Sequence, residues 1–185
     1  MTLTKTPVCD FGKKAENFKL KSIKNDYITL SDIKGEKATL IMFICNHCPY
    51  VKAIIKNLVE DCKSLKEEGV ASVAIMSNDT RSYPEDSFDN MIKFAVDNQF
   101  NDLNYLIDNN QDVAKKYGAV CTPDFFGYNN ELSLQYRGRY KELKDLKPIN
   151  NADSDLKLSM KMIAEKQKGP DTQIPSVGCN IKWFK

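Results

Sequence analysis

Two cysteines lie three residues apart in Cys45-Asn46-His47-Cys48, and the histidine between them is the only one in the chain. Thiols at this spacing, on the first turn of a helix, can close a disulfide, so that one attacks a substrate and the other releases it. The thiolate is the reactive form of cysteine, and the unpaired N–H groups of a helix N-terminus favour it. The motif therefore predicts thiol–disulfide chemistry with Cys45, Cys48 and His47 as the catalytic residues.

Two other interpretations of the motif are a zinc half-site and a pair of inert buried cysteines. A zinc site usually needs a second pair of closely spaced ligands, and His47 is confined within the motif. The remaining cysteines are isolated in the sequence: Cys9, Cys62, Cys121 and Cys179. We therefore expect no metal. We also expect no cofactor, because a dithiol stores the two electrons itself.

The elements on either side of the motif have to position it. The apolar run 38–44 contains β-branched residues and predicts a strand that is covered on both faces. From Tyr50 onward, apolar residues recur at helical spacing, which predicts an amphipathic helix. If Cys45 were the N-cap, Pro49 would remove the first intrahelical hydrogen bond, so the helix either starts near Cys48 and Pro49 or has a loosened first turn. We expect Cys45 to be the more exposed, attacking thiol and Cys48 the buried, resolving one.

The rest of the chain alternates strand and helix patterns, which predicts an α/β sheet with two parallel crossovers and an antiparallel edge. We expect one domain over residues 1–185, with a core at about 16–168 and an irregular, docked C-terminal tail over 169–185. The expected strands are 18–22, 27–30, 70–77, 105–108, 124–128 and 132–136, and the expected helices are 84–98, 111–117 and 153–168.

Composition limits the classes of partner. Basic residues outnumber acidic ones by only two, and the lysines are interspersed with acids, so we expect neither nucleic acid nor a membrane as a partner. The longest uninterrupted apolar run is 40–45, whereas roughly 20 residues are needed to span a bilayer. The first residues carry no secretory pattern. We therefore expect a cytoplasmic protein.

Three segments resemble the thioredoxin superfamily, in particular its peroxiredoxin-like branch of redoxin domains (alkyl hydroperoxide reductase and thiol-specific antioxidant-like proteins). They are TLIMFICNHCPYV at 39–51, ASVAIMSND at 71–79 with YPEDS at 83–87, and YGAVCTPDFFGY at 117–128. The resemblance implies a thioredoxin-like fold, with a central mixed sheet flanked by helices, an N-terminal β-hairpin and an inserted helix near 84–98. It also implies that Thr122 and a cis Pro123 lie opposite the cysteines and present backbone to a substrate.

The chain departs from the peroxiredoxin pattern at one informative position. Peroxiredoxins share a threonine three residues before the peroxidatic cysteine, whereas Met42 precedes Cys45 and Cys45 precedes Cys48 at that spacing. We therefore expect a thiol–disulfide oxidoreductase acting on a protein or small-molecule disulfide, with an unknown reductant. A thiol peroxidase and a redox-inactive peptide-binding module are the alternatives.

The sequence suggests roles for several other residues, and for some of them it leaves two alternatives open. His47 is expected to tune the thiolates electrostatically. Cys121 is expected near the pair, as a filler or as an additional redox thiol, whereas Cys62 is expected in the core. Cys9 and Cys179 either pair with each other or stay free. The segment 77–79 is a ligand site or a turn, and 137–139 is a cationic rim or a solvated turn.

Overall fold

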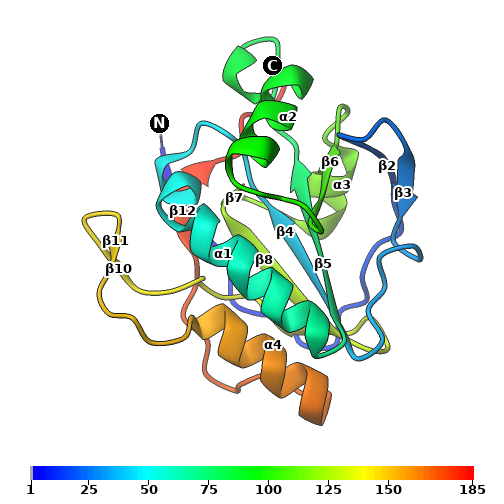
Figure 1. Cartoon of the computed structure of the whole chain (residues 1–185), viewed down its shortest axis with the longest axis vertical. Helices are drawn as coiled ribbons and strands as arrows, with labels where there is room; N and C mark the ends of the chain where they lie inside the picture. The colour runs from blue at the N-terminus through cyan, green and yellow to red at the C-terminus, as the bar shows by residue number, and fades with distance from the viewer. Residues whose placement is uncertain (1) are drawn as a thin grey trace.

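The structure is a computed structural model, and it describes residues 2–185. A seven-stranded mixed sheet with the order β3-β2-β6-β5-β4-β8-β9 forms its centre (Figure 1). β4 (Ala38–Phe43), β5 (Val70–Met76) and β6 (Asn104–Ile107) run parallel, and β8 (Asp124–Asn129) joins β4 antiparallel. Every residue of β4 is buried, as expected for a central strand covered on both faces. The predicted α/β sheet with two parallel connections is confirmed.

Antiparallel strands complete both edges of this sheet. β2 (Lys19–Ser22) and β3 (Tyr27–Thr29) form the predicted N-terminal hairpin, and β9 (Leu134–Tyr136) pairs with β8. A further small hairpin, β10 (Leu143–Lys144) with β11 (Lys147–Pro148), was not predicted. Its strands are too short to show a sequence period.

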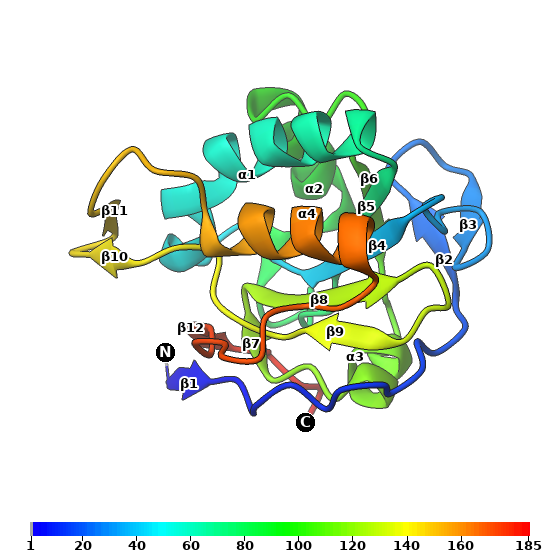
Figure 2. The ribbon, with the colours of Figure 1, turned by 90° about the horizontal axis from the view of Figure 1, so that it is seen from below.

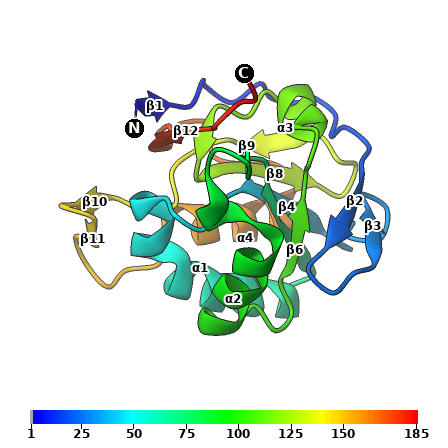
Figure 3. The ribbon, with the colours of Figure 1, turned by 90° about the horizontal axis from the view of Figure 1, so that it is seen from above.

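Helices cover both faces of the sheet. α1 (Pro49–Glu67), α2 (Phe88–Asp97) and α4 (Asp155–Lys166) lie on one face, and the short α3 (Asp112–Tyr117) lies on the other (Figures 2 and 3). α4 begins after Ser154, whose side chain accepts a hydrogen bond from the backbone N–H of Lys157. Among residues 2–185, no helix combines the length and the apolar character needed to cross a membrane.

The inserted helix predicted over 84–98 is divided in two. A 3₁₀ turn, η1 (Pro84–Asp86), comes first, and α2 starts at Phe88 after a break at Ser87. Ser87 has an extended ψ of 157°, so the two helices do not fuse. This break leaves the Asp86 side chain buried inside the protein rather than on a helix surface.

The two ends of the chain form a second sheet. β12 (Val177–Asn180) lies between β1 (Leu3–Lys5) and the two-residue β7 (Cys121–Thr122). The tail over 169–185 is therefore irregular, as predicted, except at β12. A strand of four residues with a glycine at its second position gives too weak a pattern to be recognised.

Candidate active site

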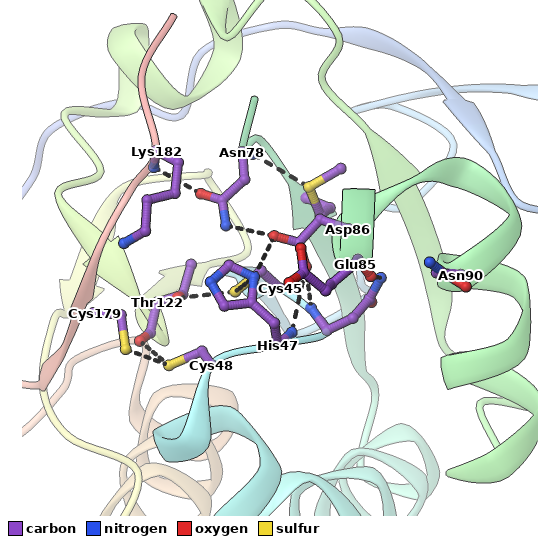
Figure 4. Close-up of polar contacts among 12 residues, drawn as sticks. Cys45, His47, Cys48, Asn78, Glu85, Asp86, Asn90, Thr122, Cys179 and Lys182 are labelled. Carbon is purple, nitrogen blue, oxygen red and sulfur yellow. Dashed lines mark hydrogen bonds and ion pairs between the residues drawn. The ribbon is translucent and has the colours of Figure 1, made fainter. Parts of the chain in front are cut away.

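The cysteine pair lies where β4 ends and α1 begins (Figure 4). α1 starts at Pro49, and Cys48 is its N-cap residue. Proline suits the first helical position, because the N–H group that it lacks would have no partner inside the helix. Cys45 precedes the helix, and its side chain is no more available than that of Cys48, with exposed fractions of 1% and 0%. The helix start near Cys48 and Pro49, one of the two alternatives expected from the sequence, is confirmed, whereas the expected greater exposure of Cys45 is not found.

Negative charge is stabilised at Cys48. The contact with Cys45 is the largest cause that lowers the pKa of Cys48, to about 5, and the Cys179 thiol, the nearby backbone N–H of Val51 and the Thr122 hydroxyl act in the same direction. Burial of Cys48 opposes the thiolate, and the carbonyl oxygen of Thr122, 3.1 Å from Cys48 Sγ, accepts a hydrogen bond from the protonated form only.

Cys45 is the protonated partner in the pair. Its contact with Cys48, its burial and the nearby Asp86 carboxylate raise the pKa of Cys45 well above its usual range. The Thr122 hydroxyl, 3.3 Å from Cys45 Sγ, acts in the opposite direction but is the weaker influence. The pKa directions in this pair therefore favour a thiolate at Cys48 over one at Cys45, whereas the sequence suggested Cys45 as the attacking thiol.

The sequence analysis missed Asp86, which has no exposed surface. Its carboxylate accepts hydrogen bonds from the backbone N–H groups of Asn46, at 2.8 Å, and His47, at 3.3 Å. It also accepts one from Asn78 Nδ2 at 2.8 Å. Asn78 comes from the segment considered as a ligand site or a turn, and its Oδ1 accepts from the backbone N–H of Lys182. The only sequence signal for Asp86 is its place in the YPEDS segment.

His47 reaches Asp86 more closely than it reaches either cysteine. Its Nδ1 is 2.7 Å from Asp86 Oδ2 and 3.9 Å from Cys45 Sγ. The hydrogen bond to Asp86 is the main cause that raises the pKa of His47. The ring also stacks on Tyr83, with centroids 5.7 Å apart. Because the Asp86 carboxylate neutralises the protonated imidazole, His47 acts on the thiols less strongly than a free imidazolium would.

The peptide bond between Thr122 and Pro123 is cis, as the resemblance implied, and Thr122 contacts both cysteines. The expected free backbone at Thr122 is absent, however. β12 pairs antiparallel with β7 so that Cys179 lies opposite Thr122. A substrate strand can pair with Thr122 only after β12 has left this edge.

A family model described as the AhpC/TSA family matches residues 11–140, which is more than half of the chain. The chain belongs to the AhpC/TSA family. This membership supports a thiol redox function and an oxidoreductase activity. No curated protein matches this AhpC/TSA chain.

Solved structures confirm the thioredoxin-like fold of this AhpC/TSA protein. An uncharacterized conserved protein from Geobacillus kaustophilus is 38% identical with a TM-score of 0.94, over 100% of this chain and 97% of that one. A hypothetical protein from Sinorhizobium meliloti 1021 is 35% identical with a TM-score of 0.90, over 98% of each chain. The thioredoxin domain of a thiol-disulfide oxidoreductase from Bacteroides vulgatus is 18% identical with a TM-score of 0.57, over 69% of this chain and 86% of that one.

Of the four remaining cysteines, Cys179 contacts the pair and Cys121 lies beside it, next to Thr122, as expected, whereas Cys9 and Cys62 lie elsewhere. Cys179 Sγ is 3.1 Å from Cys48 Sγ, so Cys179 does not pair with Cys9. The thiol of Cys121 donates to Pro123 O at 3.6 Å, and burial raises its pKa. Cys62 is buried in the core, as predicted, and burial raises its pKa to about 12.

The segment 137–139 does not form the cationic rim considered from the sequence. Arg137 is buried, and its Nη2 lies 2.9 Å from Asp124 Oδ2. Arg139 is paired with Asp155, with 2.6 Å between its Nε and Oδ2. Both guanidinium groups are therefore paired with carboxylates inside the protein, and Arg139 also lines the groove beside Pro123.

A cluster of potential metal ligands overlaps the site. One ligand atom from each of Cys45, His47 and Asp86 lies within 4.8 Å of the others. The sequence argument against a metal did not include Asp86. Because His47 Nδ1 is already hydrogen-bonded to Asp86, a cation would have to break this pair in order to use that nitrogen.

A groove of about 390 Å³ lies beside Pro123. It runs along the first turns of α1, where Tyr50 and Ile54 line it, and along the tail before β12, where Pro175 and Ser176 line it. Its lining is mostly apolar, and it is therefore suited to hold an apolar part of a substrate next to the cysteines.

Proposed function

We propose that this protein is a thiol–disulfide oxidoreductase that exchanges electrons through the Cys45–Cys48 dithiol. The observation that carries the proposal is the contact between a thiolate-stabilised Cys48 at the N-terminus of α1 and a protonated Cys45. Disulfide exchange needs a nucleophilic thiolate and a second thiol within reach of it. This site supplies both.

The reaction follows from the order of the two pKa values. The Cys48 thiolate attacks one sulfur of the substrate disulfide, and the other half of the substrate leaves as a thiolate. Cys45 then gives its proton to this leaving thiolate and attacks Cys48 Sγ. The second half of the substrate leaves, and a Cys45–Cys48 disulfide remains. The substrate gains two electrons and the dithiol loses two.

Asp86 and His47 position the nucleophile. The two backbone N–H groups that Asp86 accepts belong to the residues between the cysteines, so the carboxylate fixes the loop that carries both thiols. His47 holds the other oxygen of the same carboxylate. In this proposal His47 is a positioning residue, and Thr122 contacts the reacting sulfur atoms.

The proposed substrate is a protein or small-molecule disulfide. Both cysteines are buried, so the segments that cover them must move locally before a substrate reaches Cys48. The groove beside Pro123 offers a binding surface next to this opening. In a reducing cytoplasm, where we expect the protein to act, the resting form would be the dithiol.

A glutathione redox titration tests the proposal. The wild-type protein should form the Cys45–Cys48 disulfide with a midpoint between about −270 and −180 mV, because a low pKa at Cys48 stabilises the reduced form. Cys48→Ser should lose the disulfide and the ability to reduce insulin. Absence of a Cys45–Cys48 disulfide at every glutathione ratio would overturn the proposal and favour a redox-inactive binding module.

A thiol peroxidase is a second candidate, and one contact favours it. The Thr122 hydroxyl, 3.3 Å from Cys45 Sγ, places in the site a hydroxyl that the sequence spacing around the cysteines did not supply. The same hydroxyl also acts on Cys48, where it is a minor cause of the lowered pKa. A stopped-flow reaction with hydrogen peroxide separates the candidates, since a rate several orders of magnitude above that of free cysteine would favour the peroxidase.

A further inference from the structure

A third cysteine lies at the active site, on a strand 131 residues away in the sequence. Cys179 is in β12, its side chain is buried, and its Sγ is 3.1 Å from Cys48 Sγ (Figure 4). Cys48 Sγ therefore contacts two other sulfur atoms, those of Cys45 and Cys179. The resolving step described above uses only Cys45.

The strand that carries Cys179 is fixed to the site on both sides of this residue. Before it, Ser176 Oγ donates to Pro123 O at 2.8 Å. After it, the backbone N–H of Lys182 donates to Asn78 Oδ1 at 2.8 Å. The approach of Cys179 to Cys48 is thus built into the fold.

Gly178 shows how closely β12 is packed against the active-site loop. A Cβ atom at this position would lie 2.1 Å from Thr122 O and 3.1 Å from Pro123 N. Only glycine allows the backbone of β12 to come this near to Thr122 and Pro123. The adjacent thiol is thereby brought into contact with Cys48.

We propose that Cys179 is a third redox-active cysteine, which forms a disulfide with Cys48 in competition with Cys45. Here the proposal rests on the proposed function, because a disulfide substrate is the oxidant. In the mixed disulfide between Cys48 and a substrate thiol, Cys179 loses its proton and attacks Cys48 Sγ. The substrate leaves as a thiolate and takes this proton, and a Cys48–Cys179 disulfide remains. Two electrons pass to the substrate, as in the reaction that uses Cys45.

The geometry requires little movement for this bond. The two sulfur atoms are 3.1 Å apart and would have to approach by about 1 Å to reach a bonded distance of about 2.05 Å. In the reduced protein, burial raises the pKa of Cys179 to about 12, so its thiol donates a hydrogen bond to the Cys48 thiolate. The same contact that stabilises the nucleophile also places the second resolving thiol.

The consequence is a choice between two disulfides that share Cys48. Attack by Cys179 on the Cys45–Cys48 disulfide would release Cys45 as a thiolate, with no change in the overall redox state. The Cys48–Cys179 bond would tie β12 covalently to the start of α1. The Cys45–Cys48 bond leaves β12 held by noncovalent contacts alone.

Three variants treated with oxidised glutathione and then acid-quenched for mass spectrometry test this inference. In Cys45→Ser, we expect the Cys48–Cys179 cross-link and little glutathione adduct. In Cys45→Ser/Cys179→Ser, the adduct should persist on Cys48, at a level at least about tenfold higher, because a thiol held in contact closes faster than external glutathione exchanges. Cys45→Ser/Cys121→Ser is the matched control and should behave as Cys45→Ser.

An adduct on Cys48 that is equally abundant with and without Cys179 would overturn the inference. Circular dichroism on each variant confirms that the comparison is made between folded proteins. The result is separable from the proposed function. A Cys48–Cys179 cross-link in a protein whose wild-type form never closes the Cys45–Cys48 disulfide would uphold Cys179 as a redox-active partner of Cys48 and reject the dithiol assignment of the proposed function.

Discussion

At the scale of single residues, the position of Cys48 at the N-cap decides where the charge lies. Pro49 fixes the helix start one residue after Cys48, so the backbone N–H of Val51 lies near enough to its sulfur to lower the pKa, although the side chain makes no capping hydrogen bond. Cys45 has no such donor from the helix, and the Asp86 carboxylate raises its pKa further. Two chemically identical side chains therefore differ in reactivity because of their surroundings.

This difference predicts which variant loses the reactive thiolate. In the wild-type protein, thiolate absorbance in the ultraviolet should appear with a midpoint near the pKa of about 5 at Cys48. Cys48→Ser should remove this transition, whereas Cys121→Ser should keep it, because burial holds Cys121 protonated. A low-pH transition that survives in Cys48→Ser would instead assign the thiolate to Cys45.

His47 gives a second prediction at this scale, because it is the only histidine and has a single set of imidazole NMR signals. Its pKa should lie above 6.5 and fall in Asp86→Asn, since the hydrogen bond to Asp86 is the main cause of the rise. Because the pKa of His47 is raised in the folded protein, the His47–Asp86 pair stabilises the folded state fully below the unfolded pKa of about 6.5. This stabilisation is lost as the pH rises through the folded-state pKa. An unchanged pKa in Asp86→Asn would rule out this pairing.

At the scale of elements, Asp86 joins η1 to the loop that carries the cysteines. Asp86→Ala should lower the free energy of unfolding by about 3 kcal/mol, because the backbone N–H groups of Asn46 and His47 would lose their buried acceptor. Asp89→Ala, an exposed acid on the adjacent helix, is the control and should stay within about 0.5 kcal/mol of wild type. Chemical denaturation measures both, and equal effects would contradict the role of Asp86.

The contact between β12 and β7 makes a prediction about Gly178. Gly178→Ala should destabilise the protein by about 1–3 kcal/mol, because its Cβ would overlap Thr122 O. Val177→Ala, at a more exposed position on the same strand, should cost less than about 1 kcal/mol. Thermal unfolding compares the two variants. A Gly178→Ala variant as stable as wild type would mean that β12 does not need to lie this close to β7.

At the scale of the whole molecule, the two ends of the chain close over the active site. β1 and β12 lie side by side, and β12 covers the edge of Thr122 that contacts both cysteines (Figure 2). The terminal sheet consists of short strands, whereas β4 is buried and pairs along its whole length with β5 and β8. Local opening should therefore begin at the terminal sheet.

Hydrogen exchange tests this order of opening. Amides of β12 should exchange at least about tenfold faster than those of β4, and alkylation of Cys48 should follow the faster process. The physical reason is that separating β1 and β12 exposes the site without disturbing the central sheet. If β12 and β4 exchanged at one rate and alkylation matched it, the cysteines would be reached only by global unfolding.

The local sequence pattern was enough to predict the strands of the central sheet, the helices other than the division at Ser87, and the junction at which the cysteines lie. The apolar run 38–44 forms a strand that is buried on both faces. The apolar residues after Tyr50 recur at helical spacing and form the buried face of α1. The motif at 45–48 predicted thiol chemistry because its two sulfurs are close through the chain itself.

Only the tertiary structure decided which residues surround those sulfurs. Asp86 reaches the site from η1, Asn78 from the turn after β5, and Cys179 from β12, and no short-range pattern connects them to the motif. The pKa of a buried thiol depends on donors, charges and burial within a few ångströms. These neighbours come from distant parts of the chain, so the sequence determined the chemistry of the site, and the fold decided which cysteine carries the charge.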